Sequence, residues 1–350
     1  MKTKNLNQKG FSHFEAIVLI VVLVLISAVG TFVYSRMHKS HAGSQYFHAP
    51  YAMTTDSLGH VWVANLLGNS VTELNAKDGS FVNVYSNYNY EFNYPYAITT
   101  DNLGHVWVAN DRGSSLTELN AKDGSLVKVY DGASRSILNP TAITTDNLGH
   151  IWVVNGPAVT ELNAKDGSFV NVYRNYYGSN RPYAITADNL GHIWVSNYSL
   201  NSVIELNAKD CSLVQELSAA SYAFNFPSAI TPDNLGHIWV VNGSAVTELN
   251  TKDGSLVKVY NDASYGFNVP TAITADNLGH IWVANSRSNS VTEINTKDGS
   301  LVKVYDGASR NILDNPTAIT ADKFGHIWVG NSPVVTELNA KDGSFIQVLK

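Results

Sequence analysis

Short runs of β-type residues, separated by turn residues, fill most of the chain. Between Pro270 and Tyr305 the four runs read TAIT, HIWVAN, SVTEIN and SLVKVY. The turn DNLG separates the first two runs. The turn TKDG separates the last two, and its Asp-Gly pair is typical of a hairpin. No 3.6-residue periodicity competes with this pattern. We therefore predict four short antiparallel strands in this stretch.

This pattern of four runs occurs seven times. Each copy contains one of the seven tryptophans of the chain, and consecutive tryptophans are 42 to 46 residues apart. In the second run, Ile281 and Val283 point to one side of the strand and Trp282 and Ala284 to the other, so the strand is apolar on both faces. Such a strand needs a packed sheet on each side. The seven tryptophans are Trp62, Trp107, Trp152, Trp194, Trp239, Trp282 and Trp328.

Seven four-stranded sheets arranged around an axis meet this requirement. A period of 40–45 residues for each four-stranded unit is expected of a β-propeller blade. We predict an all-β fold, a seven-bladed propeller over residues 49–350, with each tryptophan wedged against the neighbouring blade. The first run of the first repeat begins near Tyr51 and the last run ends at Val348. Every blade is then contiguous, and the ring closes without a strand from the other terminus.

The repeat also resembles known propeller families. Its pattern P-x-A-I-T-x-D-x-x-G-H-[VI]-W-V-x-N followed by S-V-T-E-L-N is similar to the signatures of the NHL and streptogramin-lyase-like propellers and of the YVTN surface-layer propellers. The spacing between Gly-His and Trp differs from that of WD40 blades. The resemblance covers the whole repeat region and implies the fold. It implies little about function, because these propellers include lyases, lactonases and pure binding modules.

Charge and cysteine content narrow the classes of partner. The net charge of the chain is −6, and residues 44–350 contain 18 basic against 28 acidic residues. This balance disfavours a nucleic acid partner and disfavours adhesion by charge to an anionic membrane. The single cysteine, Cys211, replaces the glycine of a KDGS turn and cannot form an intramolecular disulfide. We expect stability to come from the packed core.

The N-terminal segment differs from the repeats. Residues 16–34 carry no formal charge and are mostly Val, Ile and Leu, which is enough to span a bilayer as a helix. Because Lys2, Lys4 and Lys9 precede the segment, the positive-inside rule predicts that the repeats lie outside the cytoplasm. We expect a leader at 1–10, a transmembrane helix at 11–36 and a polar stalk at 37–48.

The run KGFSHFE resembles the processing site of type IV prepilins. The resemblance implies cleavage between Gly10 and Phe11, with Phe11 as the N-methylated new terminus. It also implies that Glu15, a carboxylate at the edge of an apolar helix, pairs with the terminal amine of a neighbouring subunit. An uncleaved anchor and a conventional signal peptide are the alternatives. By these interpretations the protein is anchored in the membrane, at the cell surface or in a pilus, and in a pilus its partners include pilin subunits.

Seven of the eleven histidines lie in the repeated motif, beside an aspartate. Copies on adjacent blades are about 10 Å apart or more, too far to share a metal ion. We interpret these histidines as structural groups that hydrogen-bond the turn aspartate or a threonine of the first run, such as Thr144 or Thr274. We likewise interpret Glu161 as an edge acid near Lys and Asn155 as part of an Asx-type turn. No catalytic residue, metal or cofactor is expected.

Residues that differ between blades are better candidates for recognition. One end of the propeller, which we call the varied face, carries the connections between the second and third runs and the connections between blades. The other end, which we call the repeated face, carries the nearly invariant DNLGH and KDGS turns. The varied face also carries Arg112, Tyr198 and Arg287, and rings before the prolines, such as Phe226, that could instead cover the blades. Aromatic and small polar residues dominate it, as in binding loops. The candidate ligand-binding residues are Tyr90, Phe92, Tyr94, Tyr176, Tyr177, Arg181, Tyr222, Phe224, Tyr265 and Phe267.

Three functions remain open from the sequence. The first is an extracellular binding or adhesion propeller that recognises a glycan, peptide or other surface ligand. The second is a lyase resembling streptogramin lyases, which use a singled-out His and Glu near the channel mouth. Glu91 and Glu216 are the only glutamates of the repeats outside the regular position, and no histidine of the repeats lies outside the motif. The third is a structural spacer in a surface filament.

Overall fold

The computed structural model describes residues 46–86, 88–174, 181–307 and 312–350. The predicted leader, transmembrane helix and most of the stalk lie outside these ranges, as do Gly10, Phe11 and Glu15. Among the residues described, no helix is long and apolar enough to cross a membrane.

Within the described ranges, twenty-eight strands form seven four-stranded antiparallel sheets, each built from consecutive strands. Blade 1 contains β1 (Pro50–Thr55), β2 (His60–Asn65), β3 (Ser70–Asn75) and β4 (Phe81–Tyr85). Blade 2 contains β5 (Pro95–Thr100), β6 (His105–Asn110), β7 (Ser115–Asn120) and β8 (Leu126–Asp131). Blade 3 contains β9 (Pro140–Thr145), β10 (His150–Asn155), β11 (Ala158–Asn163) and β12 (Phe169–Arg174). Blade 4 contains β13 (Pro182–Ala187), β14 (His192–Asn197), β15 (Ser202–Asn207) and β16 (Leu213–Ser218).

The last three blades follow the same order. Blade 5 contains β17 (Pro227–Pro232), β18 (His237–Asn242), β19 (Ala245–Asn250) and β20 (Leu256–Tyr260). Blade 6 contains β21 (Pro270–Ala275), β22 (His280–Asn285), β23 (Ser290–Asn295) and β24 (Leu301–Asp306). Blade 7 contains β25 (Pro316–Ala321), β26 (His326–Asn331), β27 (Val334–Asn339) and β28 (Phe345–Leu349). Short helices occupy some connections between blades: η1 (Tyr88–Tyr90), η2 (Ala133–Arg135), α2 (Ala219–Tyr222) and η3 (Ala263–Tyr265).

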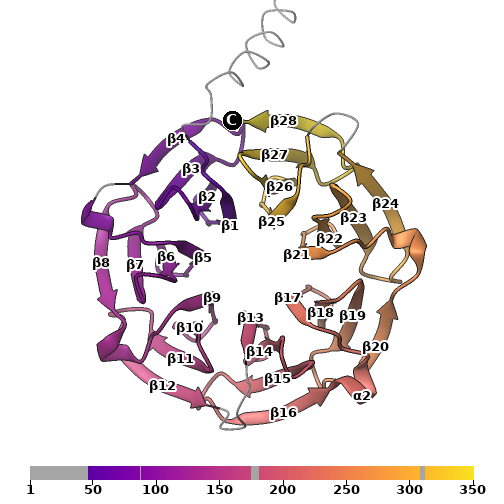
Figure 1. Cartoon of the computed structure of the whole chain (residues 1–350), viewed down its shortest axis with the longest axis horizontal. Helices are drawn as coiled ribbons and strands as arrows, with labels where there is room; N and C mark the ends of the chain where they lie inside the picture. Colours follow the sequence, from indigo (N-terminus) through magenta and orange to yellow (C-terminus); the bar gives the residue numbers. More distant parts are fainter. Residues whose placement is uncertain (1–45, 87, 175–180, 308–311) are drawn as a thin grey trace, which may run out of the picture. The chain divides into compact units, whose positions relative to one another are not determined.

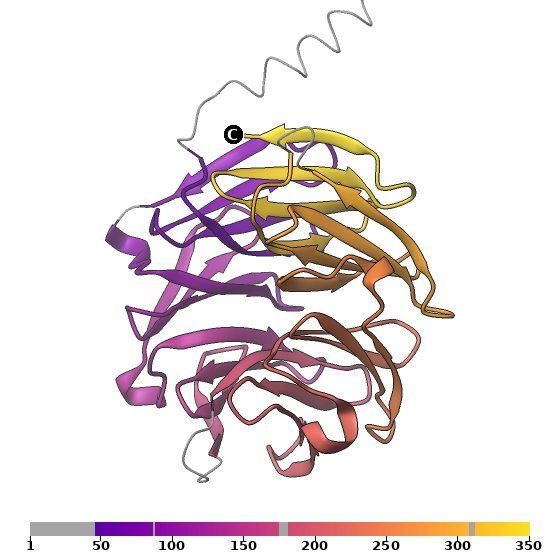
Figure 2. The same ribbon diagram turned by 45° about the vertical axis from the view of Figure 1, so that its right-hand side comes forward.

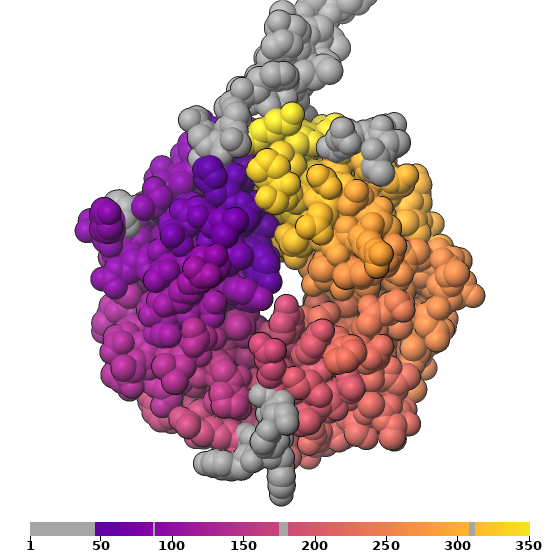
Figure 3. Space-filling model, viewed as in Figure 1, coloured from indigo at the N-terminus to yellow at the C-terminus, as the bar shows by residue number. Residues whose placement is uncertain are grey.

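The blades surround a central opening, with the first strand of each blade innermost (Figures 1 and 3). The fourth strands run around the circumference and form the outer wall, and the turned view shows the twist within each blade (Figure 2). The predicted all-β seven-bladed propeller with contiguous blades is therefore confirmed. The short helices lie at the outer wall, between neighbouring blades (Figure 1).

The core lies between blades rather than within them. All seven tryptophans are fully buried. Trp62 of blade 1, for example, shares a cluster with Ile98, Val106 and Val108 of blade 2. This confirms that each motif tryptophan packs against a neighbouring sheet, which is why the second strand of every blade is apolar on both faces.

Blades 1 and 7 close the ring with the same contacts. Trp328 of blade 7 packs with Val61 and Val63 of blade 1 and with Phe47, which lies just before β1. The Thr55 hydroxyl donates to the carbonyl oxygen of Ala321 at 3.1 Å, and the Thr317 hydroxyl donates to that of Pro50 at 3.0 Å. Side-chain packing and hydrogen bonds close the ring, and no strand is exchanged between the termini.

Candidate functional site

Each innermost strand begins with the same irregularity. In β1, Pro50 pairs with Asn65 and Ala52 pairs with Ala64, so Tyr51 between them has no partner in the ladder. The same one-residue bulge follows the first proline of all seven blades. A β-bulge redirects a side chain, and bulges are over-represented beside binding sites. Here the bulged residues are Tyr51, Tyr96, Thr141, Tyr183, Ser228, Thr271 and Thr317, and all seven line one central cavity.

Three tyrosines fill one side of this ring of bulged residues. The Tyr51 hydroxyl donates to the Tyr96 hydroxyl at 2.7 Å, and the two ring centroids are 4.5 Å apart. Burial, together with the nearby Tyr183 hydroxyl, raises the pKa of Tyr51 to about 12. Burial also raises the pKa of Tyr96, strengthened by its hydrogen bond with Tyr51. Both hydroxyls therefore remain protonated at neutral pH and act as neutral hydrogen-bonding groups.

A second aromatic wall continues from Tyr183. Its ring centroid lies 5.5 Å from that of Tyr198, and Tyr198 lies 5.0 Å from Phe226. Phe226 and Val269 precede the proline of their blades, have positive φ angles of 53° and 52°, and expose nearly half of their surface. A positive φ in a β-branched residue such as Val269 is strained. Large apolar side chains held exposed in this way are typical of binding surfaces.

The cavity enclosed by these residues has a volume of about 630 Å³, which suits a small ligand. Its remaining lining comes mainly from small and polar residues, including Ser244, Asn268, four alanines and one glycine. Among the lining residues that the structure describes, none is charged. This mouth of the channel can therefore stack against flat or apolar groups and exchange hydrogen bonds with a ligand.

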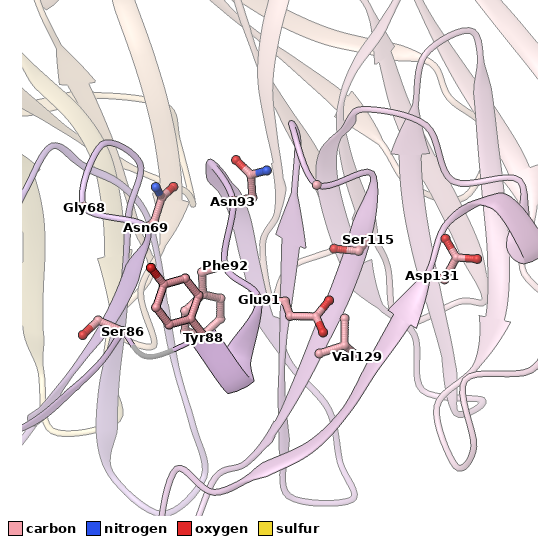
Figure 4. Close-up of a pocket in the computed structure, with 11 residues that line it drawn as sticks. Gly68, Asn69, Ser86, Tyr88, Glu91, Phe92, Asn93, Ser115, Val129 and Asp131 are labelled. Atoms are coloured by element: carbon pink, nitrogen blue, oxygen red, sulfur yellow. The ribbon is translucent and has the colours of Figure 1, made fainter.

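A second cavity, of about 800 Å³, lies towards the outer wall between blades 1 and 2 (Figure 4). Its lining combines Asn69 and Ser86 of blade 1 with Ser115 and Asp131 of blade 2. Tyr88, which is almost fully exposed, and Glu91 come from the connection between the two blades. Glu91 and Asp131 are the charged residues of this lining, so the outer cavity is acidic where the central cavity is uncharged.

Most of the predicted aromatic residues form stacked pairs at the outer wall. The ring centroids are 5.4 Å apart for Tyr90 and Phe92, 5.6 Å for Tyr222 and Phe224, and 5.5 Å for Tyr265 and Phe267. Phe92 and Phe224 are buried, and the Tyr90 and Tyr265 hydroxyls donate to the carbonyl oxygens of Gly124 and Gly299 on the next blade. These six rings therefore help to join adjacent blades, and the structure does not bring them together around one cavity.

The remaining predicted residues are separate from these pairs. Tyr94 is half-buried beneath the Arg112 guanidinium, whose central carbon lies 3.6 Å from the ring centroid. Arg181 is exposed, and its carbonyl oxygen accepts a hydrogen bond from the Tyr198 amide. Tyr176 and Tyr177 lie outside the described residues.

The repeated histidines belong to a network at the opposite end of each blade. In blade 5, one carboxylate oxygen of Asp233 accepts hydrogen bonds from the His237 Nδ1 at 3.0 Å and the Trp239 Nε1 at 2.9 Å. The other oxygen accepts from the Leu235 and His237 amides. The predicted bond between histidine and the turn aspartate is therefore present. The predicted threonine partner is not: the Thr274 hydroxyl donates to the Ala275 carbonyl oxygen.

Two interpretations of repeated polar residues were wrong. Glu161 is buried, with its carboxylate 3.2 Å from the His150 Nδ1, and is not an edge acid near a lysine. Asn155 does not form a surface turn, because it is buried and its side-chain amide donates to the Thr160 hydroxyl at 2.9 Å. Both residues look like surface groups in the sequence because they are polar, but each faces the interior between blades.

The central tyrosines were missed because they lie in a regular strand. Variation between blades is concentrated in the connections between strands, which drew attention away from the strands themselves. The signal was the residue after the first proline, which reads Tyr, Tyr, Thr, Tyr, Ser, Thr and Thr from blade 1 to blade 7. Only the bulge places this residue at the channel mouth, and hydrophobic alternation alone does not predict a bulge.

Comparison with known proteins supports the fold. No family profile and no curated protein sequence matches the chain. Among solved structures, a streptogramin B lyase is 22% identical over 83% of this chain and 93% of that chain, with a TM-score of 0.71. Virginiamycin B lyase from Staphylococcus aureus is 20% identical over 81% of this chain and 92% of that chain, with a TM-score of 0.69.

An extracellular bacterial domain is similar over part of its length. The extracellular domain assigned to a one component system of B. thetaiotaomicron is 16% identical over 88% of this chain and 43% of that chain, with a TM-score of 0.66. At these identities the likeness shows the fold and leaves the function open. The chain is a seven-bladed β-propeller similar in architecture to streptogramin B lyase.

Proposed function

We propose that the protein is a binding propeller without catalytic activity, tethered outside the cytoplasm, that takes an uncharged ligand at the channel mouth on its varied face. One observation carries this proposal: the described lining of the central cavity combines exposed aromatic rings with neutral hydroxyl and amide groups. A saccharide ring suits such a surface, because its apolar face can stack on Tyr198 or Phe226 while its hydroxyls bond to Ser228, Thr271 or Asn268. An extended peptide is the alternative ligand.

A lyase is the second candidate, favoured by the fold it shares with streptogramin B lyase. Imidazole and carboxylate groups are the commonest acid–base catalysts, and neither kind lines the described part of the channel mouth. The motif histidines begin the second strands, whereas the residues that end those strands face the mouth. A six-residue strand is about 17 Å long, so His237 lies far from the mouth. The binding proposal therefore accounts better for the residues present.

The binding proposal predicts which substitutions weaken a ligand. A glycan and peptide array probed with residues 44–350 would identify a ligand, and titration would give dissociation constants. Each stacked ring is worth roughly 0.5–1.5 kcal/mol beyond its buried area. We therefore expect Phe226→Ala and Tyr198→Ala each to weaken binding about two- to twelvefold.

Matched variants locate the contact surface. Leu138→Ala removes an exposed apolar side chain that does not line the cavity and should leave the dissociation constant unchanged. Tyr90→Ala, Tyr222→Ala and Tyr265→Ala test the aromatic residues predicted from the sequence. If these three weaken binding while Phe226→Ala and Tyr198→Ala do not, the ligand sits at the outer wall and the central site is wrong.

The proposed membrane anchor at residues 11–36 leads to a separate prediction about the native N-terminus. If the prepilin resemblance is functional, mass spectrometry of the protein from its native membrane should find a chain that begins at Phe11 with a methylated amine. A chain that begins at Met1 would remove the pilin interpretation and keep the anchor. A chain that begins after residue 30 would remove both.

A further inference from the structure

The motif glutamates are buried, and in six blades each is satisfied by the fourth strand of its own blade. In blades 1, 2, 5 and 6 a tyrosine hydroxyl donates to the carboxylate at 2.5 Å. In blades 4 and 7 a leucine replaces that tyrosine. There a glutamine two residues earlier donates instead, as Gln215 does to Glu205 at 2.6 Å. Each of these six blades therefore supplies one donor by one of two routes.

A turn glycine on the next blade makes room for this donor. The KDGS turn of blade 2 lies against the Tyr85 ring of blade 1, and a Cβ atom at Gly124 would overlap that ring. Gly167, Gly254, Gly299 and Gly343 face a tyrosine or glutamine in the same way. All these glycines have positive φ angles. The glycine is thus needed for both backbone conformation and space.

Blade 4 has Cys211 at this position. Its φ of 59° reproduces the glycine conformation, but its side chain occupies the space that the other turns leave open. The facing tyrosine, Tyr173, is half-buried and does not reach Glu161. In the four blades with the tyrosine route, by contrast, the ring stacks on the motif tryptophan with centroids 5.3–5.8 Å apart.

Glu161 is consequently a buried carboxyl group that accepts no hydrogen bond. Only 1% of its surface is exposed, and neither oxygen takes part in a hydrogen bond among the residues that the structure describes. The other six motif glutamates have no such unpartnered oxygen. A buried carboxylate that accepts no hydrogen bond is costly, so such a group favours its protonated form.

The groups around Glu161 do not offset this cost. The His150 Nδ1 is 3.2 Å from the Glu161 carboxyl group but also lies 3.0 Å from Asp146, so two carboxyl groups share this one nitrogen. Asp146, and Asp210 from the turn of blade 4, add negative charge nearby. Burial, reinforced by these two carboxylates and only partly opposed by His150, raises the pKa of Glu161 to about 7. Burial and Glu161 itself raise the pKa of the Cys211 thiol to about 12, so the thiol stays neutral.

We propose that the joint between blades 3 and 4 is a proton-controlled seam, closed while Glu161 is protonated and loosened when Glu161 ionises. The missing hydrogen bond from Tyr173 and the side chain of Cys211 create this seam, and the other six joints keep both the donor and the turn glycine. Loosening means local separation of β12 from the turn that contains Cys211, which lets water reach the carboxylate. The device would couple the rigidity of the ring to the acidity of its surroundings.

The direction of the pH dependence follows from the raised pKa. Once the seam opens, Glu161 regains its ordinary pKa near 4.5. The closed state then holds its proton more tightly than the open state between that value and about 7. The seam is most stable below pH 4.5, weakens as the pH rises, and changes no further above about 7. The opening constant should rise about tenfold per pH unit within this window.

Hydrogen exchange on the full-length protein in detergent tests the seam directly. The amides of β12 are compared between the wild type and Cys211→Gly at each pH, which cancels the intrinsic pH dependence of exchange. Cys211→Gly restores the turn found in the other blades and lets Tyr173 donate to Glu161. We expect the ratio of wild-type to variant exchange in β12 to rise about tenfold per unit between pH 5 and 7, then level off.

Two more variants separate the proton from the packing. Glu161→Gln cannot ionise and should flatten the pH dependence of β12 exchange while Cys211 remains. Gly299→Cys copies the substitution into the joint between blades 5 and 6 and should create a similar pH dependence in β20. If the wild type and Cys211→Gly show the same exchange in β12 at every pH, as they would if a buried water satisfied Glu161, the proposal is overturned. A pH dependence that persists in Glu161→Gln would also overturn it.

Discussion

Replacing Trp194 with alanine should lower the free energy of unfolding by about 3–5 kcal/mol, the usual cost of removing a large buried aromatic side chain. Trp194 is fully buried and shares a cluster with Ile230, Ile238 and Val240 of blade 5. Its indole nitrogen donates to Asp188 at 2.8 Å. The substitution therefore opens a cavity between two blades and removes one partner of a buried carboxylate.

Denaturant unfolding measured by circular dichroism gives this free energy. A matched variant separates the contribution of packing from that of the indole hydrogen bond. Trp194→Phe keeps much of the packing but loses the indole donor, so it should cost less than Trp194→Ala. Leu190→Ala, in the adjacent exposed turn, should change stability by less than about 0.5 kcal/mol. A cost below about 1 kcal/mol for Trp194→Ala would mean that the blades are not held together by their tryptophans.

The fold was predictable because its signals are local and repeated. Seven copies of one pattern give the number of blades, and four β-type runs give the number of strands in each. The second run, apolar on both faces, predicts sheets on both sides, and Trp62 confirms this by packing against blade 2. Contiguous blades follow from where the first and last repeats begin and end, and the sheet order agrees.

The site was less predictable because it depends on distortions and contacts between blades. The bulge at Tyr51 turns its side chain to the channel, although the residue lies in an ordinary strand pattern. The left-handed conformation of Phe226 places an apolar ring at the channel mouth. By contrast, Phe92 was predicted as a recognition residue because it lies in a varied connection, and the structure shows it mostly buried at the edge of the outer cavity. Variation along the sequence thus marks both contacts between blades and contacts with solvent.

The seam between blades 3 and 4 was also not predictable from the sequence. Cys211 was visible in the sequence as a departure from KDGS, and an incidental substitution was a reasonable interpretation. Its consequence depends on Tyr173, which is 38 residues earlier and on another blade. Only the packing across the joint shows that a side chain at position 211 affects Glu161.

In each motif, the turn aspartate should contribute more to the free energy of unfolding than the histidine does. Asp233 is buried and accepts four hydrogen bonds, from two amides, His237 and Trp239. Asp233→Ala removes all four bonds and leaves the Trp239 nitrogen buried without a partner. We expect a loss of about 3–5 kcal/mol in the free energy of unfolding, in the range found when one member of a buried charged pair is removed.

His237→Ala provides the matched comparison. Its side chain is 23% exposed, so it is partly solvated, and its removal leaves Asp233 with three of the four hydrogen bonds. We expect a cost of about 1–2 kcal/mol, near that of a lost hydrogen bond to a charged group. Because both residues lie on the repeated face, neither variant should change the dissociation constant of a ligand at the channel mouth. A histidine variant that lost affinity while remaining folded would place the ligand on the repeated face. If His237→Ala lowered the free energy of unfolding as much as Asp233→Ala does, the imidazole would be the centre of the network.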